Sequence, residues 1–394
     1  MMYQGLVDEA NTLRERLVAW RRDFHTHPEI GLQEWRTAGI VAAELERLGY
    51  EVTTGVAQTG VVGLLFTSRP GPVVLLRFDM DALPLQEEND VPYRSRNDGC
   101  MHACGHDGHL AIGLGVATLL ARHQNELYGT VKLMFQPGEE GLNGAQLMID
   151  DGVLDRIGPR PDIALAAHVW NDEPLGRVGV AAGPIMAAAE EWECVIQGRG
   201  GHGAAPHQTA DPIVAAAQLI LAWQTAVSRN VDPLETAVLS VGAIHAGEAF
   251  NIIPSTVTLR GTIRTFDRDV RATLLRRFKE IATGICAALE CTADISLRSL
   301  TPALVNDPDV TAKARRVIAS IVEDDQIFEP RSMGSEDMAF VNAVIPGCFL
   351  IVGSKNEQAG LVHAHHNSRF DFDEDVLPLT VALLVTVATD YLSP

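Results

Sequence analysis

Short apolar segments alternate with longer helical segments through the first half of the chain, and this alternation constrains the fold more than any other feature. The strand-length apolar runs lie at 61–66, 73–78, 131–135 and 163–167. Residues 107–127 and 145–151 have helical patterns instead. Alternating strands and helices predict an α/β domain with a mostly parallel sheet that is covered on both faces.

The N-terminal region has the periodicity of an amphipathic helix. Its apolar residues recur at spacings of three and four, at Leu6, Ala10, Leu13, Leu17, Trp20 and Phe24. Pro28 cannot prolong such a helix, so we expect one helix to end before it. Residues 34–48 predict a second helix.

The pattern changes after Gly183 and Pro184, where Trp192, Cys194 and Ile196 alternate as in a strand. The following segments read as a helix at 212–228, strands at 236–244 and 255–265, a helix at 269–289 and a strand at 291–298. This β-α-β-β-α-β order predicts a ferredoxin-like domain inserted into the larger one. We expect the first domain to comprise 1–185 and 300–394, with a strand at 349–352 and a closing helix at 375–391, and the inserted domain to comprise 186–299.

Length and charge narrow the class of protein. The 394 residues exceed the roughly 250–300 over which one core keeps growing, which agrees with two domains. The formal net charge of −20 argues against nucleic acid or an anionic membrane as partner, because both require a basic surface. Charged residues interrupt the N-terminal segment and no apolar stretch reaches the roughly twenty residues of a membrane span. Six scattered cysteines do not form a secreted-domain framework, so we expect a soluble, unprocessed, cytoplasmic protein.

Two short motifs carry the chemistry. Residues 101–109 combine Cys104 with three histidines, and residues 136–140 end in the adjacent carboxylates Glu139 and Glu140. Thiolate, imidazole and carboxylate groups hold ions such as Zn²⁺, and a carboxylate beside the ion can take a proton from its bound water. The combination predicts metal-assisted hydrolysis.

The candidate groups follow predicted strands or begin a predicted helix. Asp79 and Asp81 follow 73–78, Glu139 and Glu140 follow 131–135, His168 follows 163–167, and Cys104 and His106 precede the helix at 107. Ligands collect outside the carboxyl ends of strands in open α/β sheets, so these groups are expected to converge on one rim. A disulfide or structural zinc knuckle using Cys100 and Cys104 is the alternative for the thiols.

The inserted domain carries a second set of candidates. Residues 198–203 satisfy G-x-G-x-x-G, but prolines rather than a helix follow, so the glycines are better explained by close approach to a ligand with His202 presented. Arg264 lies on a predicted strand, thirteen residues after Asn251. It is either an ordinary solvated arginine or, at the same edge as Asn251 and His202, a clamp for a substrate carboxylate.

Further motifs extend the pattern along nearly the whole chain. In order, the motifs are RDFHTHPE at 22–29, RFDMDALP at 77–84, the 101–109 run, FQPGEEG at 135–141, GGHGAAPH at 200–207, NIIP at 251–254, GSED at 334–337 and HNSRFDF at 366–372. Together they resemble the dimetal amidohydrolases of the hippurate hydrolase and N-acyl-amino-acid hydrolase family, within the wider aminoacylase/carboxypeptidase clan.

The resemblance implies a role for each matching residue. It makes Cys104, His106, Glu140, His168 and His366 the ligands of two metal ions, and Glu139 the catalytic base. Many relatives in the clan have a histidine ligand where Asp79 stands, so we assign Asp79 and Asp81 to orienting the ligands. His365, adjacent to His366, is the alternative ligand.

The resemblance also implies an activity and an assembly. It implies hydrolysis of N-acyl amino acids, such as hippurate-like, N-acetyl or indoleacetyl conjugates, with two divalent ions drawn from Mn²⁺, Zn²⁺, Co²⁺ or Ni²⁺. The inserted domain would act as a lid and would pair two subunits in a homodimer. His202 would then stabilise the oxyanion in the neighbouring active site, while Asn251 and Arg264 would bind the substrate α-carboxylate. A metallo-dipeptidase or carboxypeptidase, and a non-catalytic metal-binding or ligand-binding protein, are the alternatives.

Overall fold

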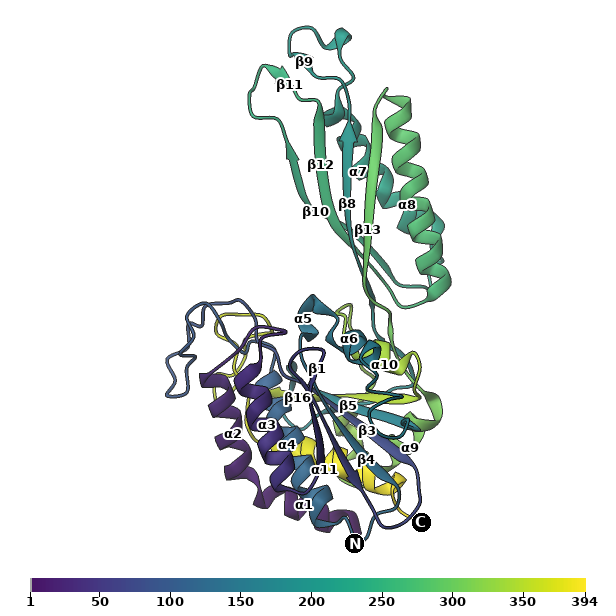
Figure 1. The fold of residues 1–394 in the computed structure, drawn as a ribbon. Helices are drawn as coiled ribbons and strands as arrows, with labels where there is room; N and C mark the ends of the chain where they lie inside the picture. Colours follow the sequence, from purple (N-terminus) through teal and green to yellow (C-terminus); the bar gives the residue numbers. More distant parts are fainter. Residues whose placement is uncertain (1) are drawn as a thin grey trace. The chain divides into compact units, whose positions relative to one another are not determined.

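The computed structural model describes residues 2–394, with side chains from Gly5 onward. The chain divides into two compact units (Figure 1). The first comprises Met1–Gly183, Val305–Pro330 and Asp337–Pro394, and the second comprises Pro184–Leu304 and Arg331–Glu336. Each unit has its own hydrophobic core.

The first unit is built on a large mixed sheet with the strand order β1-β2-β4-β3-β5-β16-β6-β15. The strands are β1 (Glu51–Val56), β2 (Gly60–Phe66), β3 (Val73–Asp79), β4 (Thr130–Gln136), β5 (Ile163–Pro174), β6 (Val178–Gly179), β15 (Ile327–Phe328) and β16 (Gly347–Lys355). The central strands β4, β3, β5 and β16 run parallel. Strand β2 pairs antiparallel with both β1 and β4. The predicted α/β fold with a mostly parallel sheet is confirmed, with an antiparallel hairpin added at one edge.

The helices of the first unit surround this sheet, some of them packed on its strands and the two N-terminal ones packed on other helices (Figure 1). They are α1 (Met2–Thr12), α2 (Arg14–Thr26), α3 (Trp35–Arg47), α4 (His106–Arg122), α5 (Glu139–Leu142), α6 (Gly144–Asp150), α9 (Pro308–Ile318), α10 (Met338–Asn342) and α11 (Val376–Tyr391). The single N-terminal helix predicted from periodicity is wrong, because the chain forms two helices that meet at Leu13. The apolar stripe is nevertheless buried as expected, for example at Leu17 and Phe24.

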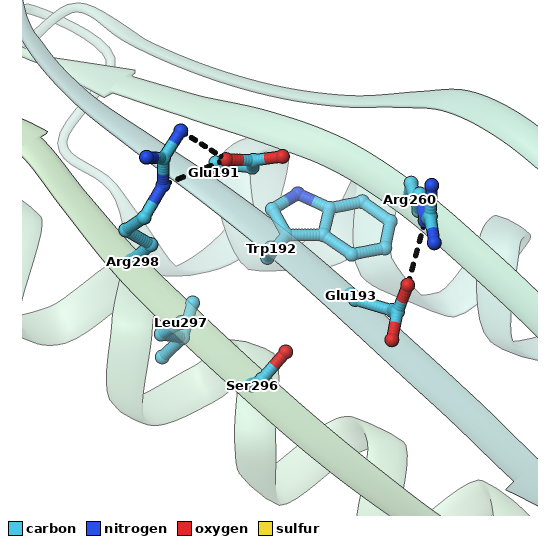
Figure 2. Close-up of a pocket in the computed structure, with 7 residues that line it drawn as sticks. All are labelled: Glu191, Trp192, Glu193, Arg260, Ser296, Leu297 and Arg298. Atoms are coloured by element: carbon cyan, nitrogen blue, oxygen red, sulfur yellow. Dashed lines mark hydrogen bonds and ion pairs between the residues drawn. The ribbon is translucent and has the colours of Figure 1, made fainter. Parts of the chain in front are cut away.

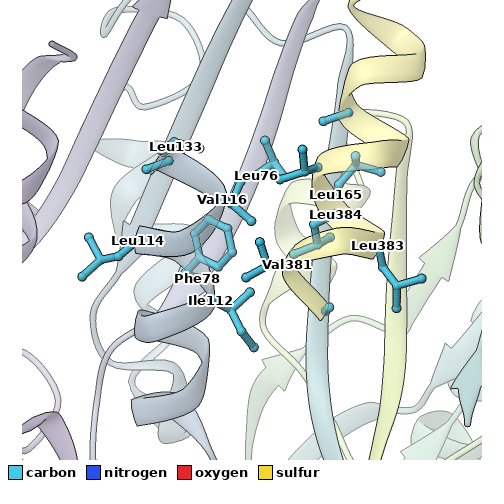
Figure 3. Close-up of a cluster of buried hydrophobic side chains, with 14 of the residues drawn as sticks. Leu76, Phe78, Ile112, Leu114, Val116, Leu133, Leu165, Val381, Leu383 and Leu384 are labelled. Atoms are coloured by element: carbon cyan, nitrogen blue, oxygen red, sulfur yellow. The ribbon is translucent and has the colours of Figure 1, made fainter. Parts of the chain in front are cut away.

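The core of the first unit brings α4 and α11 onto the central strands (Figure 3). Phe78 of β3 and Val381 of α11 are among the buried side chains that meet there. Gly113 of α4 permits this close approach, since a Cβ at that position would lie 2.7 Å from Phe135 Cε1 and 2.8 Å from Phe78 Cδ2. The tight packing fixes α4, whose first residue is His106, against the strands that carry the other candidate site residues.

The second unit is a four-stranded antiparallel sheet, with the order β10-β12-β8-β13, packed against two helices. Its main elements are β8 (Ala188–Gln197), α7 (Pro212–Asn230), β10 (Ala237–Ala246), β12 (Thr256–Thr265), α8 (Arg268–Ala288) and β13 (Thr292–Thr301). Short strands β9 (Gly201–His202) and β11 (Ile252–Ile253) pair with each other in this unit, and β7 (Gly183–Met186) and β14 (Leu304–Asn306) span the chain positions that divide the two units. The β-α-β-β-α-β order and this strand arrangement confirm the ferredoxin-like prediction.

Aromatic residues fill the core of the second unit. The rings of Trp192, Trp223 and Phe278 lie 4.4–5.0 Å apart. Trp223 Nε1 also donates a hydrogen bond to the Phe278 carbonyl oxygen at 2.9 Å. These large side chains explain how a small unit forms a core of its own.

Charged residues line a pocket on the second unit's sheet (Figure 2). The pocket has a volume of about 360 Å³. Arg298 pairs there with Glu191 at 2.7 Å, and Arg260 pairs with Glu193 at 2.6 Å. Exposed ion pairs of this kind contribute at most about 1 kcal/mol each, so their effect on the free energy of unfolding is small.

Within residues 2–394, no helix has both the length and the apolar character that crossing a membrane requires. All six cysteines lie in the described part of the chain and are free thiols, so the disulfide alternative for Cys100 and Cys104 is wrong.

Candidate metal centre

The candidate metal ligands converge at one place in the first unit. Strand β5 carries His168, α4 begins with His106, and Glu139 and Glu140 follow β4 in the short helix α5. Three overlapping groups of ligand atoms form there, with the atoms of each group within 4.8 Å of one another: Cys104, His106 and His168; Cys104, Glu140 and His366; and His106, Glu139 and Glu140. The structure thus brings together all five residues proposed as ligands, and the proposed base beside them.

Hydrogen bonds orient the two buried histidines. His106 Nδ1 lies 2.9 Å from the Asp81 carbonyl oxygen, and His168 Nδ1 lies 2.6 Å from the Val169 carbonyl oxygen. A carbonyl oxygen accepts only from a protonated nitrogen, so we infer that the Nδ1 atom of each ring carries a proton. His106 Nε2 is buried and, among the described residues, has no hydrogen-bond partner. His168 Nε2 lies 3.6 Å from Cys104 Sγ.

His366, rather than His365, joins the cluster. His366 Nε2 lies 3.1 Å from Glu140 Oε1, and the residue has φ 65°, a left-handed conformation held by a hydrogen bond from its N–H to the Ala103 carbonyl. His365 Nε2 instead accepts from the Asn171 N–H at 3.0 Å. Burial lowers the pKa of His365 to about 3, so its ring stays neutral.

Asp79 belongs to a supporting network. Its carboxylate lies 2.6 Å from His109 Nδ1 and accepts from Arg77 Nη1 at 2.7 Å. His109 Nε2 accepts from the Val169 N–H at 3.0 Å, so both ring nitrogens of His109 are engaged. Burial alone would raise the pKa of the Asp79 carboxyl, but His106, His109 and Arg77 outweigh burial and bring the pKa well below its usual range. These charged neighbours therefore keep the Asp79 carboxyl ionised.

Asp81 holds the backbone of the two adjacent glutamates. Its two carboxylate oxygens accept from the Glu139 N–H at 3.0 Å and the Glu140 N–H at 2.9 Å. The turn begins at Gly138, which has φ 58°. Glu139 Oε1 in turn accepts from the Asp337 N–H at 3.3 Å. Asp81 thereby fixes the direction in which both glutamate side chains leave the turn.

The donor set fits divalent cations. Burial raises the pKa of the Cys104 thiol well above its ordinary value, and Glu140 raises it further. A divalent cation would reverse this effect, because coordination deprotonates a thiol. A core held only by hydrogen bonds would leave no buried nitrogen such as His106 Nε2 without a partner. Thiol, imidazole and carboxylate groups gathered around such a nitrogen are the arrangement expected of a metal site.

Sequence reasoning missed several residues that support the cluster. Arg77 donates to Gln136 Oε1 at 2.7 Å and to Asp337 Oδ1 at 2.8 Å, in addition to Asp79. A buried arginine within an otherwise apolar strand was the available signal for this network. His109 belonged to the metal-rich motif but received no role of its own.

The second unit holds the other proposed site residues. His202 and Asn251 are exposed and lie together, because β9 pairs with β11 and the Gly203 N–H donates to the Asn251 carbonyl at 2.8 Å. Arg264 lies at the opposite end of β12, where it pairs with Ala189 at the start of β8. The eight residue steps from Thr256 to Arg264 span about 26 Å of strand. The alternative in which Arg264 lies at the same edge as His202 and Asn251 is therefore wrong within one subunit.

Arg264 is half-buried, and among the residues that the structure describes its Nη1 atom has no hydrogen-bond partner. Burial lowers its pKa, which Glu190 partly offsets. A buried guanidinium nitrogen without a partner is costly and suits a bound anion.

Known proteins resemble this chain over nearly its full length. IAA-amino acid hydrolase ILR1-like 2 of Arabidopsis thaliana is 39% identical over 381 residues, covering 95% of this chain and 85% of that protein. Thermostable carboxypeptidase 1 of Saccharolobus solfataricus is 36% identical over 385 residues, covering 96% of both. The crystal structure of the Bacillus subtilis YXEP protein, described as a dinuclear metal binding peptidase from the M20 family, matches with a TM-score of 0.84 and 32% identity, covering 97% of this chain and 99% of that one.

A family model agrees with these similarities. The model of Peptidase family M20/M25/M40 matches residues 75–390, a range that includes all of the proposed ligands. The resemblance inferred from the motifs is confirmed at the level of the family. The chain belongs to Peptidase family M20/M25/M40.

Proposed function

We propose that this chain is a metal-dependent amidohydrolase that cleaves the amide bond of N-acyl amino acids and releases a carboxylic acid and a free amino acid. The observation that carries the proposal is the pair of ligand groups that share Cys104, with Glu139 beside them. The similarity to a relative named as an IAA-amino acid hydrolase supports an amide between an acyl group and an amino acid as the substrate.

Two divalent ions would be held by Cys104, His106, Glu140, His168 and His366. The two ligand groups that share Cys104, and the dinuclear metal binding described for the B. subtilis structure, support two ions rather than one. Bound divalent ions make water acidic enough to react near neutral pH and polarise a carbonyl group. Mixed sulfur, nitrogen and oxygen ligands suit Mn²⁺, Zn²⁺, Co²⁺ or Ni²⁺.

Glu139 is the general base in this proposal. It takes the proton from the attacking water and passes it to the departing amine nitrogen, so one carboxylate serves both steps. Asp81 and Asp337 support this role, since their hydrogen bonds hold the Glu139 backbone and side chain. Asp79 and Asp81 orient the cluster without being assigned as ligands.

A homodimer would complete the site through the inserted unit. Its helix α7 exposes Ile213, Val214 and Leu221, and the edge strand β10 exposes Ile244, so apolar surface suited to a second copy lies on this unit. His202 would stabilise the oxyanion in the neighbouring subunit's active site. Asn251 and Arg264 would bind the substrate α-carboxylate and, since Asn251 lies before the start of β12 and Arg264 lies near its end, would come from different subunits.

A carboxypeptidase or dipeptidase is the second candidate function. The 36% identity with Thermostable carboxypeptidase 1 favours it, and the same cluster could hydrolyse a peptide bond next to a free carboxylate. The two candidates differ in the group on the acyl side of the bond. N-acyl amino acids lack the free amino group of a dipeptide substrate.

A substrate panel tests the proposal. The enzyme, loaded in turn with Mn²⁺, Zn²⁺, Co²⁺ and Ni²⁺, should hydrolyse benzoyl-, acetyl- or indoleacetyl-amino acids with a higher kcat/KM than dipeptides and carboxypeptidase substrates. The control is Glu139→Ala, which should keep the wild-type metal content and lose nearly all turnover, because only the base is removed. Preference for dipeptides would support the second candidate instead. Complete inertness of the metal-loaded wild type would favour a non-catalytic binding protein, and an active Glu139→Ala would reject the base.

A further inference from the structure

Glu34 is a buried carboxylate at the start of α3 whose side chain does not cap that helix. It is the N-cap residue of α3, a position whose side-chain oxygen usually accepts from the first turn of the helix. Within the described chain, Glu34 makes no such bond. Glu29 performs the capping instead, accepting from the Arg36 N–H at 3.0 Å and the Thr37 N–H at 2.8 Å. The Glu34 carboxylate is therefore available for another purpose.

That carboxylate reaches the turn which carries the proposed base. Glu34 Oε1 accepts from the Gly138 N–H at 3.0 Å, and Glu34 Oε2 accepts from Thr59 Oγ1 at 2.5 Å. Asp81 accepts from the next two N–H groups, those of Glu139 and Glu140. Three consecutive N–H groups are thus held by two buried carboxylates that come from different parts of the chain.

The segment before α3 also packs closely under this turn. A Cβ on Gly31 would lie 2.7 Å from Leu142 Cδ1 and 3.0 Å from Gly138 Cα, so the two backbones are in contact. Leu32 adopts φ 63° and Gly138 adopts φ 58°, so both sides of this contact are in left-handed conformations. The close packing leaves little room for the turn to move, and the hydrogen bond from the Gly138 N–H to Glu34 holds the turn against this segment.

We propose that Glu34 is a positioning residue for catalysis: through the Gly138 N–H it sets the turn from which Glu139 approaches the reacting water. Glu34 contacts neither substrate nor metal in this account. The inference rests on the proposed role of Glu139 as the base. Position 34 then requires a side chain with the length and hydrogen-bonding capacity of glutamate, but not its charge.

Two substitutions separate length from charge. Glu34→Gln keeps the length and a carbonyl oxygen that can accept from Gly138, and its NH₂ group can donate to Thr59. Glu34→Asp keeps the charge but withdraws the oxygen from Gly138. We expect Glu34→Gln to stay within about threefold of the wild-type kcat, and Glu34→Asp to lose about 10- to 100-fold in kcat with little change in KM, because small displacements of a catalytic group have effects of this size.

Hydrogen exchange provides a readout that is independent of turnover. Peptides containing Gly138 should exchange faster in metal-loaded Glu34→Asp than in the wild type, whereas Glu34→Gln should match the wild type. Metal content should be unchanged in both variants. Glu29→Asp is the matched control, since it shortens the capping carboxylate of the same helix without touching the turn; it should lower the Tm and leave kcat and exchange at Gly138 unchanged.

A wild-type kcat in Glu34→Asp would overturn the inference, as would equal losses in Glu34→Gln and Glu34→Asp. A loss in Glu34→Asp without faster exchange at Gly138 would also overturn it, because the effect would not pass through the turn. The Glu139→Ala variant keeps the two proposals distinguishable. If Glu139→Ala is inactive and Glu34→Asp is fully active, only the positioning role fails; if Glu139→Ala is active, the assigned base itself is wrong.

Discussion

The metal cluster of the first unit and the His202 hairpin of the second unit are constructed in opposite ways. In the cluster, buried partners orient most of the chemistry-bearing side chains, as the Asp81 carbonyl does for His106 and the Val169 carbonyl does for His168. On the hairpin, His202 and Asn251 are exposed, and the His202 ring accepts from the Ala204 N–H of its own loop at 3.0 Å. A single chain thus holds the proposed metal ligands in place, but it does not fix the proposed substrate-binding side chains of the hairpin.

The physical reason for this difference is the cost of burying polar groups. A buried imidazole or carboxylate must find hydrogen-bond partners within the fold, so the groups around a buried metal site become fixed when the chain folds. Exposed groups can rely on water and need no such support. His202 and Asn251 are therefore free to be organised by a substrate or by a second subunit.

Among the variants that test this difference between the two regions, replacement of His202 should cause the largest loss of kcat. We expect His202→Ala to lose about 10²- to 10³-fold in kcat, the usual loss when one oxyanion donor is removed. Heterodimers that combine a His202→Ala subunit with a Glu139→Ala subunit should regain about half of the wild-type activity, because one of the two sites would then contain both residues. Differently tagged subunits, co-expressed and purified as the mixed dimer, allow this to be measured.

The same mixed dimer can also contradict a site shared between two subunits. If His202 acts in the active site of its own subunit, each site in the heterodimer keeps one defect and activity stays at the level of the single variants. A monomer in solution would likewise contradict the shared site. Either outcome would mean that the exposed hairpin is not completed by a second copy.

Replacement of Arg264 should have a smaller and more selective effect. Arg264→Ala removes a charged hydrogen bond to the substrate carboxylate, worth about 1.5–3 kcal/mol, and should mainly raise KM. Steady-state kinetics on an N-acyl amino acid and on the matching amide without the α-carboxylate measure the difference. The amide should be affected little; equal losses on both substrates would reject the carboxylate clamp.

Most of the fold was predictable because its elements have regular patterns of apolar residues. The long parallel strands are almost uniformly buried, as β4 is throughout, and short apolar runs reveal them. Strand β1 was missed because its sequence, EVTTGV, is polar and mostly exposed. Strands β6 and β15 have two residues each, which is too short for any periodicity to be recognised.

From the sequence, the site could be predicted only where the type of a side chain indicates that it can bind a metal. The Cys104 and His106 motif and the Glu139–Glu140 pair could be selected as candidates because few side chains bind metals, whereas the division into ligands and base came from the family resemblance. Their supporting contacts could not, since Arg77 and Asp337 are 260 positions apart and Glu34 and Gly138 are 104 apart. The error on Arg264 has a related cause: alternation along a strand predicts which face a residue occupies, but not which strand end lies beside another loop.

Anomalous diffraction from crystals of the metal-loaded protein tests the central claim most directly. The account predicts two peaks per chain at the absorption edge of the added metal, one beside Cys104, His106 and His168 and the other beside Cys104, Glu140 and His366, with Glu139 next to both. A cluster without metal, or a single ion bound elsewhere on the chain while these side chains keep only their hydrogen bonds to one another, would contradict it.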